Sequence, residues 1–283
     1  MEIIEYTEGM KIPELGFVAN MPNDVYQAID THVSNSRMKL MGESPFKYFN
    51  PSPWTDTRPK QMGSAIHAAI LEPKMFQSEY MLLPEIQDRR KPEYKRAKEV
   101  FGESRTFVGN ECENIETMFN AVYTNDAALE LLTDDGINEL SGFAVCPRTG
   151  LKLRIRFDRL NNFKVAVDLK KTQSVSDRDL SNTIFNYGYH IQEAFYSYVF
   201  ELIAGYPLES FKFVFVEEKH PNEVSVRHLD DISKAIAKEK MLELLDNIKH
   251  YSENRDQVHN NAPEEMIALP EWVMREYENN LGV

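Results

Sequence analysis

The sequence predicts a mixed fold, of the α/β or α+β class, with a central mixed sheet flanked by helices. Two patterns carry this prediction. Apolar residues alternate with a period of two in several segments between residues 139 and 229, as they do in half-buried strands. Apolar residues at helical spacing precede, interrupt and follow those segments. Helices on either side of a strand-rich region are typical of these classes.

The first half of the chain is predicted to be mainly helical. Ser34 suits the N-cap of a short helix that ends before Ser44-Pro45. Small residues fill the segment 63–71, which predicts a helix packed closely against the sheet and ending at Glu72-Pro73. Further helices are expected near residues 23–30 and over 110–133, with a loop over 50–60 and a polar loop and helix over 85–105.

The second half is predicted to form the sheet. Ser176 and Asp179 resemble a capping box, and the helix that they open is expected to run to about Ala204. The segment 211–216 is apolar at nearly every position, which indicates a central strand. Other strands are expected over 139–145, 151–157, 163–170 and 224–229, and a closing helix over 232–249.

Two carboxylates and a lysine lie on two adjacent predicted strands, at Asp158, Asp168 and Lys170. If a three-residue turn over 162–164 joins the strands, Asn161 pairs with Val165 and Asp158 lies opposite Asp168. Directly opposed side chains have Cβ atoms roughly 5 Å apart, close enough to share a cation. A two-residue turn would instead place the carboxylates on opposite faces of the sheet.

This constellation is typical of nucleases that use magnesium. Paired carboxylates hold hard cations through oxygen, and such cations polarise a phosphate and generate the attacking hydroxide. A lysine near that water can hold it in place or stabilise charge on the phosphate. The alternative is an exposed hairpin with ordinary solvated charges.

Composition sets the limits of these interpretations. The chain has 283 residues, of which 42% are hydrophobic, and no apolar run approaches the ~20 residues that span a bilayer. The N-terminus does not resemble a secretory signal. Cys112 and Cys146 lie far apart, which excludes a cysteine zinc site built by this chain alone and fits a reducing cytoplasm. We therefore expect a cytoplasmic protein that does not associate with a membrane.

The charge distribution is uneven. The net charge is −13, which is unusual for a nucleic-acid-binding protein. The segment 148–171 nevertheless carries eight Lys/Arg and two Asp, a local charge of +6, whereas 239–283 carries a local charge of −6. We expect Arg154 and Arg156 to contact DNA phosphates beside the carboxylates, with the acidic surface confining DNA to one groove or channel. The alternative is a solvated basic strand and an acidic tail.

Three further residues are candidates because of their order in the sequence relative to the two strands. His67 lies in a helix of small and apolar residues, where nothing local requires an imidazole. Gln192 and Tyr196 are four residues apart on the helix that follows the lysine strand, so they lie on one face of it. Taken singly, the histidine would be an ordinary core or surface residue, and the pair an ordinary helix surface. Their order relative to the strands is what makes them candidates.

That order resembles the PD-(D/E)XK nuclease superfamily, in the branch with a motif histidine and a Q-x-x-x-Y helix. Within it the chain is similar to the RecE-type exonucleases (exonuclease VIII) of phages and prophages. The segment Gly63-Ser-Ala-Ile-His67 followed by Leu71-Glu-Pro, the strand ending at Asp158, the motif Asp168-Leu-Lys170 and the pair Gln192 and Tyr196 carry the resemblance. Phe157 stands where proline is expected, and Lys171 where a threonine commonly follows the lysine.

The resemblance implies a restriction-endonuclease-like core and a role for each motif residue. Asp158 and Asp168 would bind Mg²⁺, with Mn²⁺ expected to substitute, helped by His67 and the carbonyl of Leu169. Lys170 would position or activate the attacking water. Gln192 would hold DNA or the lysine, and Tyr196 would brace the site. Glu139 is a further candidate ligand or supporting carboxylate, the alternative being an exposed charge before a strand.

The resemblance also implies an activity and partners. It points to a metal-dependent deoxyribonuclease with a two-metal mechanism that degrades linear double-stranded DNA from its ends, 5′→3′, in recombination or repair within a bacterial cell. It implies a partner single-strand annealing protein. We also expect a cyclic homo-oligomer, a trimer or tetramer, with the strands of 148–171 facing its channel.

Three alternatives stay open. The same core could serve an endonuclease or a nuclease for single strands. A DNA-end-binding protein without catalysis would keep the fold but not the activity, and a protein unrelated to nucleic acids would be consistent with the net charge. We expect a single domain over 1–283, in which residues 34–219 carry the motifs and 220–283 form a C-terminal strand and helix extension.

Overall fold

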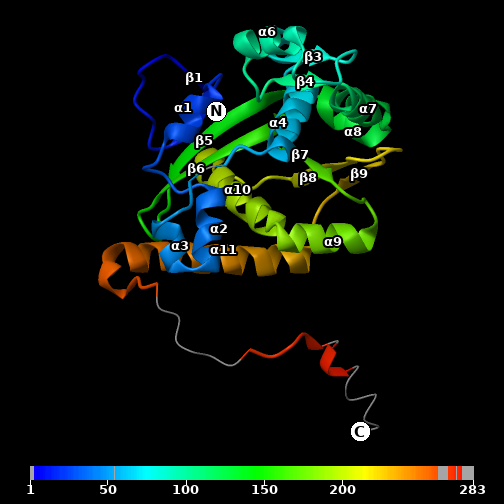
Figure 1. Ribbon diagram of the computed structural model, residues 1–283. Helices are drawn as coiled ribbons and strands as arrows, with labels where there is room; N and C mark the ends of the chain where they lie inside the picture. Colours follow the sequence, from blue (N-terminus) through cyan, green and yellow to red (C-terminus); the bar gives the residue numbers. More distant parts are fainter. Residues whose placement is uncertain (1–2, 54, 261–266, 272, 276–283) are drawn as a thin grey trace.

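A seven-stranded mixed sheet forms the centre of the computed structural model, which describes residues 3–53, 55–260, 267–271 and 273–275 (Figure 1). The strand order is β1-β2-β5-β6-β7-β8-β9, with β1–β2 and β7–β8 parallel and the other neighbours antiparallel. The strands are β1 (Ile3–Glu5), β2 (Gly16–Ala19), β5 (Gly136–Val145), β6 (Lys152–Asn161), β7 (Val165–Thr172), β8 (Ser210–Glu217) and β9 (Val224–Arg227). A separate parallel pair joins β3 (Met81–Leu83) to β4 (Thr106–Val108).

Helices cover both faces of the sheet (Figure 1). The N-terminal helices are α1 (Asn23–Ala28), α2 (Asn35–Glu43), α3 (Pro45–Phe49), α4 (Arg58–Leu71), α5 (Pro73–Glu79) and α6 (Pro92–Phe101). The others are α7 (Asn110–Thr124), α8 (Asp126–Thr133), α9 (Asp177–Asn186), α10 (Tyr189–Ala204), α11 (Asp231–Glu253) and the 3₁₀ turn η1 (Arg255–Gln257). No helix in these described ranges is long and apolar enough to cross a membrane.

Two buried cores divide the helices between the faces. On one face, α2, α3, α9, α10 and α11 bury residues such as Phe195 and Met241 against Phe157 and Phe213 of the sheet. On the other face, α4 and α7 pack residues such as Ile66 against Val167 of β7. The small residues predicted to bring the helix of 63–71 close to the sheet are buried there: Ala65, Ala68 and Ala69. The mixed α/β fold predicted from the sequence is therefore confirmed.

Most predicted elements are present, with shifted boundaries. The Ser34 side chain accepts a hydrogen bond from the Arg37 amide and begins α2, as its N-cap role predicts. The helix predicted over 63–71 begins earlier, at Arg58, so the predicted loop over 50–60 is shorter; residue 54 in that loop lies outside the described residues. The helix predicted over 110–133 is two helices, because Asn125 ends α7 and its side chain caps α8.

The helix predicted from Ser176 to Ala204 is also two helices. Ser176 caps α9 as expected, and its hydroxyl also hydrogen bonds the Asp179 carboxylate. The break falls at Gly188, whose φ of 62° is left-handed and suits glycine. The prediction failed because apolar spacing continues across the break, whereas a single glycine decides the backbone there.

The C-terminal region joins the main core. Met241, Leu244, Leu245 and Ile248 of α11 are buried in the core beneath α10. The predicted extension over 220–283 therefore packs on the motif-bearing part of the chain as far as α11. Residues 261–266, 272 and 276–283 of that predicted extension lie outside the described residues.

Candidate active site

The strands that carry Asp158 and Asp168 pair as the three-residue turn predicts, and then separate. Asn161 pairs with Val165, and Arg159 with Val167, but no backbone pair follows at Asp158. The Asp158 side chain replaces the missing backbone pair: its Oδ2 accepts a hydrogen bond from the Leu169 amide at 2.8 Å. The two strands thus form a fork, closed by this hydrogen bond.

The alternation of β6 breaks at the fork. Phe157 and Leu160 both belong to the core beneath α10. They are three residues apart, and strict period-two alternation would place them on opposite faces of the sheet. Asp158 lies at the break and contacts His67 of α4, whereas Asp168 bonds to Gln192 of α10. The prediction that the two carboxylates lie side by side on one face is therefore wrong, although the predicted register is confirmed up to Arg159 and Val167.

His67 contacts both sides of the fork. Its Nε2 lies 2.8 Å from the Leu169 carbonyl oxygen, to which it donates, and its Nδ1 lies 3.6 Å from Asp158 Oδ2. The helix α4 that carries it is held against the sheet by small buried residues. The family resemblance implied that His67 and the Leu169 carbonyl help to bind a metal, and the structure brings the two together, joined to each other by a hydrogen bond.

Glu139 completes a cluster with His67 and Asp158. One ligand atom of each of these three residues lies within 4.8 Å of the others. In the described part of the chain, this is the one group of three or more His, Cys, Asp or Glu side chains that could hold a metal ion. Glu139 stands opposite Asp158, between the pairs Asn138–Arg159 and Leu140–Phe157. Its φ of 50° is uncommon for a residue other than glycine, and such strain is concentrated at functional sites.

The electrostatics of Glu139 fit a carboxylate whose charged form a bound cation would favour. Burial, followed by the negative charge of Asp158, raises the pKa of the Glu139 carboxyl to about 8. Arg156 opposes that rise, with its Nη1 3.9 Å from Glu139 Oε2. Two carboxylates crowded together in this way favour a bound cation, because the cation removes their repulsion.

Asp168 lies at the centre of a buried polar group. Its carboxylate is only 2% exposed, with Oδ2 2.6 Å from Lys170 Nζ and Oδ1 accepting a hydrogen bond of 2.6 Å from Gln192 Nε2. Burial raises the pKa of Asp168, the Lys170 ammonium opposes the rise, and the negative charge of Asp158 adds to it. Asp158 and Asp168 are thus close enough to interact, although Asp168 is outside the cluster around His67.

Lys170 is held as a cation. Burial alone would lower its pKa, but the carboxylates of Asp168 and Asp158 outweigh burial and raise it. Its Nζ also lies 4.9 Å from the centre of the Tyr189 ring, a cation–π distance. A protonated lysine can orient water and stabilise negative charge, but it cannot accept a proton.

Tyr196 packs beneath the site rather than opening into it. Its ring meets Phe157 edge-on at 5.5 Å between centroids and Phe211 at 6.2 Å. Burial chiefly raises the pKa of the Tyr196 hydroxyl, and the charges of Asp168 and Asp158 raise it further. The expected bracing role suits this position, under the strands that carry both aspartates.

The structure corrects the expectation for Arg154 and Arg156. Both are only 7% exposed, and both guanidinium groups lie over the ring of Tyr26, at 4.5 and 4.4 Å. Arg154 donates to the Tyr26 carbonyl, and Arg156 donates to the Met21 carbonyl at 2.6 Å. These arginines fix the N-terminal segment to the sheet, so they offer no exposed cation to a DNA phosphate.

Most of the other Lys/Arg of the segment 148–171 also have partners within the chain, whereas Lys152 is exposed. Arg159 donates to the carbonyls of Leu131 and Asp134. Ion pairs hold most of the others, as Arg148–Asp246, Lys164–Glu209, Lys170–Asp168 and Lys171–Glu218. The excess of positive charge therefore does not form a free basic surface. A run of cations in the sequence cannot reveal partners that lie far along the chain.

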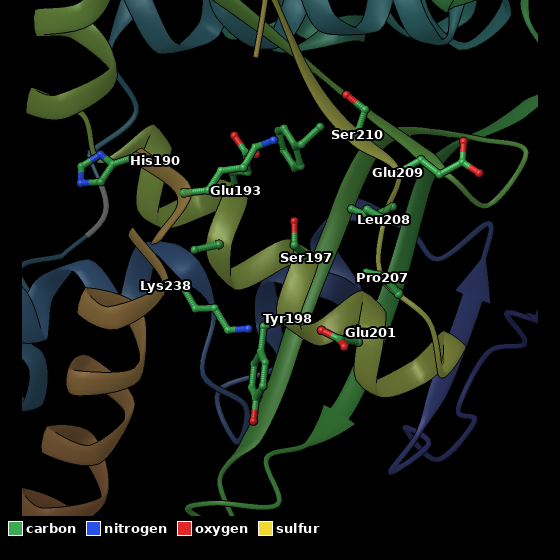
Figure 2. Close-up of a pocket in the computed structure, with 13 residues that line it drawn as sticks. His190, Glu193, Ser197, Tyr198, Glu201, Pro207, Leu208, Glu209, Ser210 and Lys238 are labelled. Atoms are coloured by element: carbon green, nitrogen blue, oxygen red, sulfur yellow. The ribbon is translucent and has the colours of Figure 1, made fainter. Parts of the chain in front are cut away.

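A separate pocket of about 190 Å³ lies on the other side of α10 (Figure 2). It is lined by residues of α10, of the segment before β8 and of α11, among them Glu193, Ser197, Ser210 and Lys238. None of the residues predicted for the active site lines it. Glu193 is 4% exposed, and burial raises the pKa of its carboxyl to about 7.

Sequence comparison assigns the chain to a family. The family described as a PDDEXK-like domain of unknown function (DUF3799) matches residues 34–266, so the chain belongs to this family. The fork, with Asp158 on one strand and Asp168-Leu-Lys170 on the next, is the part of the structure that agrees with the PDDEXK-like description. No curated protein matches the chain in sequence.

One solved structure is similar to this chain in fold. A candidate exonuclease from Eubacterium rectale is 15% identical, with a TM-score of 0.56 over 88% of this chain and 96% of that protein. A second structure, named SSO0001, is 11% identical with a TM-score of 0.28, over 67% of this chain and 87% of that one, and carries no argument. The first similarity supports the mixed fold with its central sheet.

Sequence reasoning underrated one residue. Glu139 was only a further candidate, with an exposed charge before a strand as the alternative, whereas it lies within β5 and faces Asp158. The signal that could have found it is the pairing of β5 with β6 around the turn at 146–151. Extending that register backward places Glu139 opposite Asp158, but a sequence does not show that the strand continues so far.

Proposed function

We propose that this protein is a divalent-metal-dependent nuclease that hydrolyses phosphodiester bonds of DNA. The observation that carries the proposal is the cluster of His67, Glu139 and Asp158 beside the buried Asp168–Lys170 pair, in a PDDEXK-like domain. We further propose Mg²⁺ as the metal, linear double-stranded DNA as the substrate, and 5′→3′ degradation from ends. The similar fold of the candidate exonuclease supports the same class.

The donor set fits a hard divalent cation. Carboxylate oxygens suit Mg²⁺ and Mn²⁺, and an imidazole suits Mn²⁺ better than Mg²⁺. Burial, followed by the charge of Asp158, raises the pKa of Glu139, and a bound cation would favour its charged form. Glu139 and Asp158 would hold the cation, with Asp168 approaching it from the other strand and His67 adding a nitrogen or fixing Asp158. When bound, the metal would lower the pKa of a water and neutralise charge on the phosphate.

The chain's own residues would then orient the reactants. Lys170, kept protonated by Asp168, is suited to hold the attacking water or to stabilise charge on the phosphate. Asp168 holds Lys170 through its Oδ2, and Gln192 donates a hydrogen bond to the other carboxylate oxygen, Oδ1. Gln192 thus helps to fix the carboxylate that holds the lysine. We therefore assign Gln192 a positioning role through Asp168 rather than direct contact with DNA.

Assembly into a ring is part of the proposal. An acidic protein holds a polyanion poorly in an open groove, because screening at physiological salt limits electrostatic reach to about 8 Å. A cyclic trimer or tetramer would retain DNA by topology instead. Because most Lys/Arg of the segment 148–171 have partners within the chain, the proposal does not place this segment on the channel wall. A single-strand annealing protein as partner and a role in recombination or repair remain proposals that follow from the resemblance.

A single experiment distinguishes the proposed activity from the alternative functions on the same fold. The purified protein is incubated with Mg²⁺ and linear duplex, relaxed circular duplex or single-stranded DNA, the linear duplex being labelled at one 5′ or one 3′ end. We expect loss of linear duplex only, with early release of the 5′ label as mononucleotide. Cleavage of the circle would indicate an endonuclease, loss of single strands alone a single-strand nuclease, and binding without cleavage a DNA-end-binding protein.

A further inference from the structure

The turn between α9 and α10 exposes aromatic side chains next to the catalytic lysine. Phe185 is 72% exposed and Tyr187 is 64% exposed, which makes them the two most exposed aromatic residues in the described part of the chain. Large apolar side chains gathered at one exposed place indicate a binding surface. Their position relative to Lys170 indicates what they bind.

Tyr187 is the outer member of an aromatic stack that leads inward to the active site. Its ring stacks on Tyr189 at 5.7 Å between centroids and an interplanar angle of 18°. Tyr189 in turn stacks on Phe213 of β8 at 6.1 Å, and Lys170 Nζ lies 4.9 Å from the Tyr189 ring. Two rings, Tyr187 and Tyr189, would therefore separate a planar group stacked on Tyr187 from Phe213 in the core. Only the Tyr187 ring would separate that group from Tyr189, the residue beside Lys170.

The turn is held in place before any ligand arrives. Lys39 of α2 donates a hydrogen bond of 2.6 Å to the Tyr187 carbonyl, and its Nζ lies 5.6 Å from the Tyr189 ring. Gly188 adopts a left-handed φ, and a Cβ there would lie 3.3 Å from Lys39 Cε, so glycine makes room for the lysine. Such preorganisation lowers the entropy cost of binding.

The local charge suits a polyanion. Lys39 and Lys170 both approach the Tyr189 ring, and Asp168 is the carboxylate that acts on both. Burial, followed by the Lys170 ammonium, lowers the pKa of Lys39 to about 8. Lys39 thus brings a cation to the turn that carries Tyr187, where a nucleotide stacked on Tyr187 would place its phosphate.

A second stacked pair lies beside the first. Phe185 stacks on His190 at 5.5 Å with an interplanar angle of 11°. Both residues line a groove of about 510 Å³, whose lining also includes His228 and Arg227, the latter ion-paired with Asp177. An exposed aromatic pair beside an open groove is an arrangement by which proteins hold unpaired nucleotides, because every base offers a flat face.

We propose that Tyr187 is a stacking platform for an unpaired nucleobase next to the scissile phosphate, so that the protein prefers DNA ends carrying single-stranded or frayed nucleotides. This inference rests on the proposed nuclease function and refines its substrate. A fully paired base is already stacked in the duplex and would have to leave that stack to reach Tyr187.

The test compares binding of tailed and blunt duplexes in EDTA, which prevents cleavage, by fluorescence anisotropy with end-labelled DNA. Wild type is expected to bind the tailed duplex more tightly than the blunt one. Tyr187→Ala should weaken binding of the tailed duplex by about 5- to 100-fold, the range expected for loss of one stacked base. Tyr187→Phe keeps the ring and should keep the wild-type affinity. Val100→Ala, at an exposed residue of α6, is the matched control and should change nothing.

Each other outcome is decisive. Wild-type affinity of Tyr187→Ala for the tailed duplex, in a preparation that cleaves DNA, overturns the stacking proposal and leaves the nuclease intact. If Tyr187→Ala instead changes the oligomer measured by light scattering and weakens tailed and blunt DNA equally, the surface is a contact between copies. A folded wild-type protein that neither binds nor cleaves any of these DNAs overturns the proposed function, and the stacking proposal with it.

Discussion

The carboxylate of Asp158 takes the place of a backbone partner for Leu169, accepting the hydrogen bond of its amide at 2.8 Å where β6 and β7 separate. One residue thus joins the two strands and offers a ligand to the cluster with His67 and Glu139. Substitutions at Asp158 can separate these two roles, because asparagine keeps an acceptor and loses the charge.

Asp158→Asn should abolish cleavage with little loss of stability, whereas Asp158→Ala should abolish cleavage and also destabilise the fold. The alanine variant leaves the Leu169 amide without its partner, which costs about 1–3 kcal/mol for a buried group. Urea unfolding of both variants and a cleavage assay at saturating Mg²⁺ check this. Equal stability of the two variants would remove the structural role, and near-normal cleavage by either would remove Asp158 from the chemistry.

Lys170→Met should cost about 3–5 kcal/mol of unfolding free energy, because it leaves the Asp168 carboxylate buried without its cation. The double variant Lys170→Met with Asp168→Asn should recover a large part of that loss, since it removes the buried charge as well. Both variants should lack activity. Chemical denaturation of the four proteins of this cycle measures the coupling. Additive effects of the two substitutions would show that the pair is not coupled in the fold.

Arg156→Gln should destabilise the protein without changing how DNA affinity depends on salt. Its guanidinium is buried and donates to Ser141 and to the Met21 carbonyl, so it releases no counterion from DNA. The slope of log K against log salt is measured for wild type and variant by anisotropy in EDTA. A clearly flatter slope for the variant would restore the sequence-based expectation that Arg156 contacts phosphates.

Glu193→Gln should change the pH dependence of stability. The pKa of Glu193 is raised by burial from 4.5 to about 7 in the folded protein. A carboxyl whose pKa is higher in the folded than in the unfolded protein stabilises the fold while it is protonated. The contribution of Glu193 to the free energy of unfolding is therefore complete below pH 4.5, the value in the unfolded chain, and is lost as pH rises through about 7, the value in the folded protein. The variant should therefore gain stability relative to wild type across this window, by at most about 3 kcal/mol.

Unfolding of wild type and Glu193→Gln at the acid and alkaline ends of that window is the measurement. Glu201→Gln, at an exposed residue lining the same pocket, serves as the control and should leave the pH dependence unchanged. A constant difference between Glu193→Gln and wild type at all pH values would show that the pKa of Glu193 is the same in the folded and unfolded states.

The sequence predicted the mixed α/β fold where local chemistry decides structure, and the roles of the site residues stay predictions. Ser34 and Ser176 cap the helices expected of them, and Asn161 pairs with Val165 as the three-residue turn requires. The caps and the turn were predicted correctly because they depend on neighbouring residues. The structure also brings His67, Asp158, Asp168, Lys170 and Gln192 close together, a grouping that only the resemblance to a known superfamily had suggested.

The failures concern contacts between distant segments. Alternation predicted Asp158 and Asp168 on one face, but the strands separate before that pair and the alternation breaks. Arg154 and Arg156 looked exposed because their partners, Tyr26 and Met21, lie more than a hundred residues earlier. Glu139 was underrated because its importance depends on the pairing of β5 with β6. None of these follows from local periodicity.

The most direct test of the central claim is the cleavage of linear duplex DNA by wild type, Glu139→Gln and Asp158→Asn across a Mg²⁺ titration, with metal binding to each protein measured by calorimetry. We expect cleavage by wild type that appears with bound Mg²⁺ and stops in EDTA, and weakened metal binding with loss of cleavage in both variants. A folded wild type that neither binds Mg²⁺ nor Mn²⁺, or a variant that binds metal and cleaves like wild type, would contradict the account.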